Sequence, residues 1–223
     1  MQGEISLIGK DVEVIEYPRK VDMWNCLTHA VGAVLSVTGL LLMLIKADDA
    51  RHFAAAFIFG LSLVAVYTMS AVYHGLPCSE AKRRARLADH CTVPLLIAGT
   101  ATPCVLIILF DLDMKHGWFV LILAWSCTAF GIFTRLFFFE KLKNLTVGVY
   151  IASGILMLVS VIPLLKDINS GAFGRIVTGC MFYLAGSVFC LLGVKKPWLH
   201  VVFHLFVLLG SVIHFYAVYT YMF

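Results

Sequence analysis

Charged side chains are scarce in this chain. Asp, Glu, Lys and Arg together make up 13% of its 223 residues, whereas apolar residues make up 61%. A water-soluble domain of this length covers its surface with far more polar groups, so the composition excludes that class. The chain is therefore expected to have lipid as its main solvent.

Paired cysteines are also lacking. The seven cysteines are an odd number, fall mostly within apolar runs and form no CxxC motif. This pattern excludes a disulfide framework and a zinc–cysteine site, and it predicts that the cysteines are small packing residues. Alternating apolar and polar residues are absent too, which argues against an outer-membrane barrel. The first apolar run is long and has no small-residue cleavage site after it, so it is not read as a signal peptide.

Long apolar runs are what the chain does contain. Each is about 20 residues long, the length with which an α-helix crosses ~30 Å of hydrocarbon. The seven runs cover roughly 24–45, 53–74, 90–110, 117–139, 145–165, 173–194 and 199–220. The sequence thus predicts an all-α fold, a bundle of seven transmembrane helices. Residues 1–20 are expected to form a short cytoplasmic N-terminal segment and residues 21–223 the membrane domain.

The basic residues between the runs indicate an orientation. Ten Lys and Arg lie at 19–20, directly before the first run, or in the loops after the second, fourth and sixth, against five in the opposite loops. The positive-inside rule then places the N-terminus inside and the C-terminus outside, and we expect a multi-pass protein of the plasma (cytoplasmic) membrane. The basic cluster 82–86 is read as a cytoplasmic face that touches anionic lipid, not as a nucleic-acid site.

Polar side chains within the runs gather at one membrane depth. His200 and His204 are four residues apart, so they share a helical face and lie about 6 Å apart along the axis. With the N-terminus inside, three other helices bring polar groups to the same cytoplasmic ends. These groups are Asn25 and His29 in the first helix, Ser70 and His74 in the second, and Asp89 and His90 in the third.

These residue types favour a zinc ion. Three imidazoles and one open position are typical of a catalytic zinc site, in which a water is acidified toward neutral pH. His200 and His204 do not form HExxH, so the catalytic base has to come from another helix, and Asp89 is the carboxylate at hand. Ser70, one turn before His74, can hydrogen-bond the reacting group or orient a ligand.

Other interpretations stay open at this point. Histidines at helix ends often sit in the interfacial zone without a special role. Asn25 and His29 either cap and pack the first helix or support the metal ligands from behind, and His90 either orients Asp89 or faces lipid head groups. His214 lies about 21 Å along the axis from His200, so it cannot join the same site.

Several motifs resemble those of one family when they are taken together and in order. They are Asn25-Cys-Leu-Thr-His29, Ser70-Ala-Val-Tyr-His74-Gly-Leu-Pro77, Asp89-His90, Leu95-Leu-Ile-Ala-Gly-Thr100 with Pro103, Pro197-Trp-Leu-His200-Val-Val-Phe-His204, and His214-Phe-Tyr. With them the chain resembles the haemolysin III family, within the progestin and adiponectin receptor superfamily. The family's first motif usually begins with glutamate, and here Asp22 is the nearest carboxylate, with a shorter reach.

The resemblance carries its own expectations for the site. It implies a seven-helix bundle with its N-terminus inside and Zn2+ held by His74, His200 and His204. It places Asp89 near the water at the metal and Ser70 beside the site. The superfamily is similar to the alkaline ceramidases and has been proposed to hydrolyse lipid amides.

Three functions compete on this basis. The first is a zinc-dependent hydrolase that acts on a ceramide-like amide among its partners, the membrane lipids. The second is a receptor or regulator of membrane lipid state in which zinc is structural. The third is the haemolytic, pore-forming activity that the family name suggests. It ranks last, because a uniformly apolar chain is inserted during synthesis and does not attack foreign membranes from solution.

Overall fold

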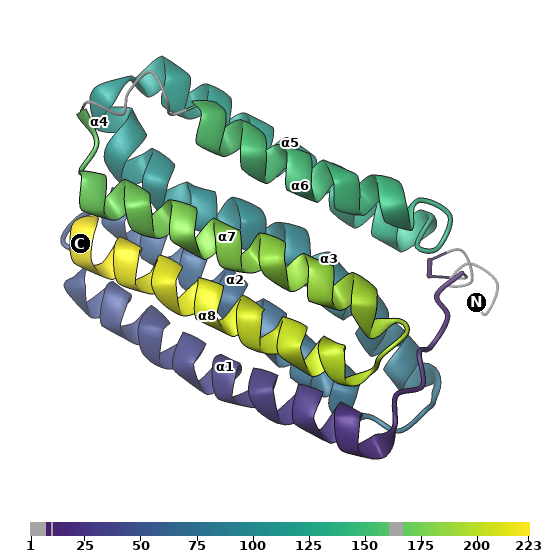
Figure 1. Cartoon of the computed structure of the whole chain (residues 1–223). Coiled ribbons are helices and arrows are strands. Elements are labelled where there is room, and N and C mark those ends of the chain that lie inside the picture. The colour runs from purple at the N-terminus through teal and green to yellow at the C-terminus, as the bar shows by residue number, and fades with distance from the viewer. Residues whose placement is uncertain (1–7, 10, 161–166) are drawn as a thin grey trace, which may run out of the picture.

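The structure is a computed structural model that describes residues 8–9, 11–160 and 167–223, and this part of the chain is all-helical (Figure 1). The helices are α1 (Arg19–Lys46), α2 (Ala50–Gly75), α3 (Glu80–Pro103), the π-helical turn η1 (Cys104–Leu109), α4 (Phe110–Leu112), α5 (Met114–Phe137), α6 (Lys143–Ser160), α7 (Ser170–Gly193) and α8 (Trp198–Tyr221). They confirm the expected all-α class.

Six of the expected spans are long and apolar enough to cross a membrane. They are α1, α2, the continuous stretch Glu80–Leu112, α5, α7 and α8. The remaining expected run, 145–165, begins within α6, and its last residues, 161–165, lie outside the described residues. The helices lie side by side with their long axes aligned, as the packing of membrane helices requires (Figure 1).

Polar caps explain where the helices begin. Asp49 accepts a hydrogen bond from the backbone of His52 at the start of α2, and Asp113 plays the same part for α5. Ser79 accepts from the backbone N–H of Lys82 and starts α3 ten residues before the apolar run. Asp89 and His90 therefore lie more than two turns inside α3, and the expectation that they open this helix was wrong.

The early start of α3 also changes the basic cluster. Lys82 and Arg86 are 3% and 6% exposed, because they lie in the helix and turn toward carboxylates inside the protein. The expected contact of this cluster with lipid head groups is therefore wrong for these two residues. The Arg84 side chain, in contrast, is 71% exposed.

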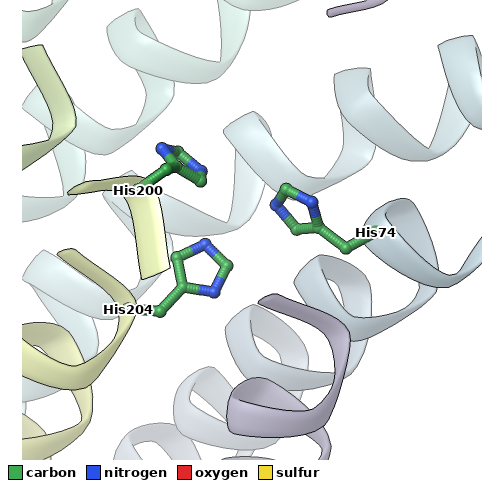
Figure 2. Close-up of side chains that lie close together, drawn as sticks. All are labelled: His74, His200 and His204. Carbon is green, nitrogen blue, oxygen red and sulfur yellow. The ribbon is translucent and has the colours of Figure 1, made fainter. Parts of the chain in front are cut away.

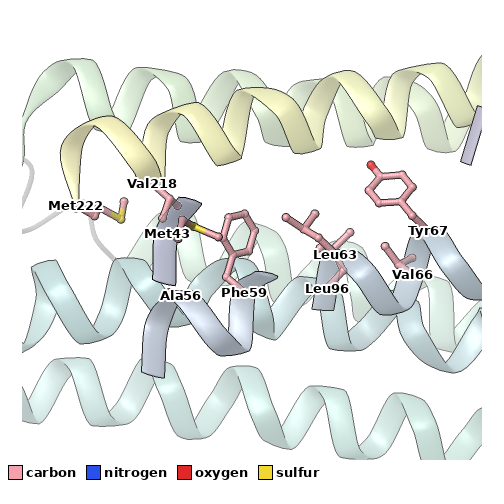
Figure 3. Packing of buried hydrophobic residues seen from close by; sticks show 9 residues of the cluster. All are labelled: Met43, Ala56, Phe59, Leu63, Val66, Tyr67, Leu96, Val218 and Met222. Atoms are coloured by element: carbon pink, nitrogen blue, oxygen red, sulfur yellow. The ribbon is translucent and has the colours of Figure 1, made fainter. Parts of the chain in front are cut away.

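The core runs lengthwise between α1, α2, α3 and α8 (Figure 3). Its buried members are Met43, Ala56, Phe59, Leu63, Val66, Tyr67, Leu96, Val218 and Met222. Close approach of α1 and α2 depends on small residues, since a Cβ at Gly32 would lie 2.5 Å from the Tyr67 ring. Large apolar side chains also cover the outside, among them Ile45 at 83% exposed, as a lipid-facing surface requires.

Helices α7 and α8 pack around a buried histidine, His214. His214 is 1% exposed, and its Nε2–H donates to the carbonyl of Ile176 at 2.9 Å. Its ring fills the space over Gly179, where an added Cβ would lie 2.2 Å from the imidazole Cδ2. The histidine is thus a packing and hydrogen-bonding residue of the helix pair, far along α8 from His200.

We predict that Gly179→Ala destabilises the protein by about 1–3 kcal/mol, because the new methyl group overpacks the α7–α8 contact. Gly174→Ala is the matched control on the same helix, since a Cβ there meets nothing within 4 Å. Thermal unfolding in detergent, followed by circular dichroism, measures both variants. Equal unfolding temperatures would contradict the packing described.

Candidate metal centre

Three histidines from two helices face one another at one end of the bundle. His74 comes from the last turn of α2, and His200 and His204 come from the first two turns of α8 (Figure 2). Their ring centroids are 4.8–5.4 Å apart, and each ring offers a nitrogen within 4.8 Å of the other two. His74 and His204 are buried, whereas His200 is partly exposed.

A carboxylate fixes the orientation of His74. The Nδ1–H of His74 donates to Asp22 Oδ1 at 2.8 Å, and Lys82 Nζ donates to the other carboxylate oxygen at 2.7 Å. The lysine neutralises the carboxylate and also donates to the Leu76 carbonyl at 3.1 Å. His74 Nε2, which points away from Asp22, is buried and has no hydrogen-bond partner among the described residues. An unpartnered nitrogen of this kind requires an explanation, and a metal ion supplies one.

Backbone atoms of α1 fix the second ligand. His204 Nδ1–H donates to the carbonyl of Asn25 at 3.3 Å, and the Thr28 hydroxyl lies 3.5 Å from the same nitrogen. This leaves Nε2 as the nitrogen with a free lone pair. The ring of His29 stacks on His204 with centroids 3.7 Å apart and meets Tyr67 edge-on. Asn25 and His29 are both buried; the Asn25 carbonyl and the His29 ring contact His204, and the Asn25 amide nitrogen lies 3.5 Å from His74 Nδ1.

Two more expected residues meet beside this cluster. Ser70 lies one turn before His74 on α2, is 3% exposed and lies beside the Asp89 carboxylate. Asp89 is not a member of the group of three close ligand atoms. His90 turns to the other side of α3, where it meets the ring of Phe139 edge-on at 4.8 Å. The structure therefore brings Ser70 and Asp89 together but does not bring His90 to them.

The three imidazoles fit a zinc ion. In a tetrahedral zinc site with metal–nitrogen bonds of about 2.1 Å, the ligand nitrogens lie about 3.4 Å apart, and modest side-chain rotation closes the present spacing to that value. Nitrogen ligands without thiolates suit zinc better than copper(I). A second group of possible ligands, Asp48, Asp49 and His52, is largely exposed and already serves to cap α2.

Sequence reasoning missed two residues of this centre. Asp22 was seen as a short substitute for the family's glutamate, and Lys82 as part of a surface patch. The signal available was the spacing of three between Asp22 and Asn25, which puts both on one face of α1. The position of Lys82 has no comparable signal, because it depends on where Ser79 starts α3.

The fold and the site define a class: an integral, multi-pass α-helical membrane protein with a cluster of three histidines at one end of its bundle. A model of the haemolysin-III related family matches residues 18–215. The chain therefore belongs to the haemolysin III family, as the motifs indicated.

Relatives of known name support this assignment. The chain is 32% identical to "Hemolysin-3" of Bacillus cereus over 205 residues, which cover 91% of this chain and 92% of the relative. It is 31% identical to "Hemolysin-3 homolog" of Bacillus subtilis (strain 168), over 91% and 94% of the two chains. A more distant relative is "Monocyte to macrophage differentiation factor" of Homo sapiens, 27% identical over 89% and 83%. These matches place the chain in the wider adiponectin receptor-like superfamily.

We predict that Lys82→Met lowers the free energy of unfolding by about 3 kcal/mol, since it leaves the Asp22 carboxylate without its cation in a mostly buried place. The exposed pair of Arg84 with Glu80 is the control, and Arg84→Met should change stability by less than about 0.5 kcal/mol. Chemical denaturation in detergent measures both. The double variant Asp22→Asn with Lys82→Met should recover much of the loss, and no recovery would speak against the pairing.

Proposed function

We propose that this protein is a zinc-dependent hydrolase of lipid amide bonds, with the ion held by His74, His200 and His204. The convergence of the three imidazoles, with Nε2 of His74 buried and unpartnered, is the observation that supports the proposal. When bound, zinc supplies a Lewis acid that polarises a carbonyl and acidifies water.

The other residues of the site would serve the proton transfers. Asp89 would act as the general base, because its carboxylate can accept a proton from the attacking water and return it to the leaving amine. Ser70, beside this carboxylate, would hold it by a hydrogen bond and fix its direction. Asn25 and His29 would support the ligands by holding and stacking on His204.

The proposal includes an arrangement in the membrane. We infer seven spanning helices, with α6 as the fifth, the N-terminus inside and the C-terminus outside. The support is the excess of Lys and Arg at the end of the bundle where the histidines lie. The centre would then face lipids of the cytoplasmic leaflet of the plasma membrane. An amide just below the head group, as in ceramide, fits that depth.

A regulator of membrane lipid state with a structural zinc is the second candidate. One observation favours it: the contacts around the histidines join three helices, through Asp22 with His74 and through His29 with His204. An ion at their centre would strengthen that junction whether or not a reaction takes place. Haemolysis, the activity named in the relatives, has no comparable support, since lipid-facing apolar side chains cover the bundle.

We predict that His200→Ala removes both zinc and lipid-amide hydrolysis, whereas Asp89→Asn keeps zinc and loses about 10²–10⁴-fold in rate, the usual contribution of a general base. Metal analysis of the purified protein and release of fatty acid from ceramide in proteoliposomes measure the two effects. If zinc is only structural, no hydrolysis is seen and His200→Ala lowers thermal stability alone. Full lipid turnover by a zinc-free His200→Ala variant would sink the hydrolase proposal.

We further predict that Asp22→Asn weakens zinc binding about 10–100-fold, the usual cost of losing the carboxylate that orients a metal-bound histidine. Asp22→Glu, which restores the residue usual in the family, should bind within a few-fold of the natural protein. Asp48→Asn removes an exposed carboxylate at the opposite end and is the control. Competition with a chelator of known affinity measures all three, and equal affinities across the set would exclude the orienting role.

A further inference from the structure

Residues 11–18, just before α1, lie across the end of the bundle that holds the histidines (Figure 1). We call residues 11–18 the N-terminal strap. Val12 of the strap is 5% exposed, so this segment packs on the protein, although the sequence led us to expect it outside the bundle. Two arginines of α3 hold its main chain: Arg86 donates to the carbonyl of Glu13, and Arg83 donates to that of Gly9, just before the strap.

Further contacts tie the strap to the neighbouring loops. The backbone N–H of Glu140, between α5 and α6, donates to the Asp11 carboxylate at 2.9 Å. The Cys78 thiol, between α2 and α3, donates to the carboxylate of Glu16 at 3.3 Å, and this hydrogen bond raises the pKa of the thiol. The strap is thus fixed to α3 and to the loops that precede α3 and α6.

Tyr17 is the strap residue that reaches the cluster. Its ring stacks on His200 with centroids 5.1 Å apart and planes 24° apart, and it lies 5.7 Å from the ring of His74. An aromatic ring therefore covers two of the three imidazoles from the side where the chain leaves the bundle.

We propose that the N-terminal strap is a lid that closes the aqueous mouth of the three-histidine centre, with Tyr17 as its plug. Ions and water-soluble reagents would reach the imidazoles only when the strap lifts. Of the two tests below, the zinc-exchange test rests on the proposed zinc site, and the histidine-modification test does not. The inference goes beyond that site in assigning to this chain's own N-terminal residues the control of access to it.

Zinc exchange tests the lid in the full-length protein. With zinc-loaded protein in nanodiscs and a water-soluble chelator in excess, Tyr17→Ala should speed zinc release roughly two- to tenfold, the factor by which one aromatic contact shifts an opening equilibrium. Tyr17→Phe keeps the ring and should behave like the natural protein. Ile15→Ala is the matched control, because Ile15 lies on the same strap with its side chain exposed.

The rates of zinc uptake and zinc release together distinguish a lid from a residue that only supports His200. A lid bars entry and exit alike, so Tyr17→Ala should speed zinc uptake by the same factor and leave the dissociation constant within about twofold. If Tyr17 only braces His200, release is faster, uptake is unchanged and affinity falls, and the lid proposal is overturned. Asp11→Ala, which loosens the strap far from the histidines, should also speed exchange in both directions.

A second measurement needs no metal. In the metal-free protein, modification of His200 by diethyl pyrocarbonate, followed by mass spectrometry, should be faster in Tyr17→Ala than in Ile15→Ala or the natural protein. Equal rates in all three overturn the lid. Faster modification in a protein that binds no zinc would uphold the lid and reject the proposed zinc site, so the two failures are distinguishable.

Discussion

Two imidazoles of the histidine cluster are held in place by hydrogen bonds to α1, and this constraint organises one end of the molecule. His74 finds the Asp22 carboxylate, and His204 finds the carbonyl of Asn25. Both partners belong to α1, which therefore has to lie against α2 and α8 at that level. The helix packing and the centre thus depend on the same few hydrogen bonds.

The charge of Asp22 in turn requires a cation, which α3 provides. A carboxylate that is largely enclosed needs a cation, and Lys82 supplies it because Ser79 starts α3 early enough to place Lys82 beside α1. One turn further, Arg86 contacts Glu140 and the strap carbonyl of Glu13. Burial and the hydrogen bonds from Arg86 and Lys143 act in opposite directions on Glu140, and the hydrogen bonds leave its pKa below the ordinary value. Lys82 and Arg86 of α3 are therefore internal, paired charges, whereas Arg84 is a surface charge.

The sequence was sufficient for the all-α class and for the three histidines that meet at the centre, because both depend on strong periodic signals. Apolar runs of membrane length give helices, and histidines at matched depth on α2 and α8 meet once the bundle forms. The sequence was insufficient where a prediction depended on the residue at which a helix begins or on the side of the helix that a residue occupies. The cap at Ser79 moved Asp89 inside α3, and the side of α3 on which His90 lies turned it toward Phe139.

The position of the strap could not be predicted from the sequence either. Residues 11–18 carry charges and no long apolar run, and such a segment is ordinarily assigned to solvent. Its position follows from arginines on α3 whose direction no sequence pattern specifies. His214 gives the contrast within one helix: it is as deeply buried as His204, yet its Nε2–H is spent on the Ile176 carbonyl. A buried histidine becomes a candidate ligand only where its remaining nitrogen is free and other donors converge on it, and here that happens at the end of the bundle that the strap covers.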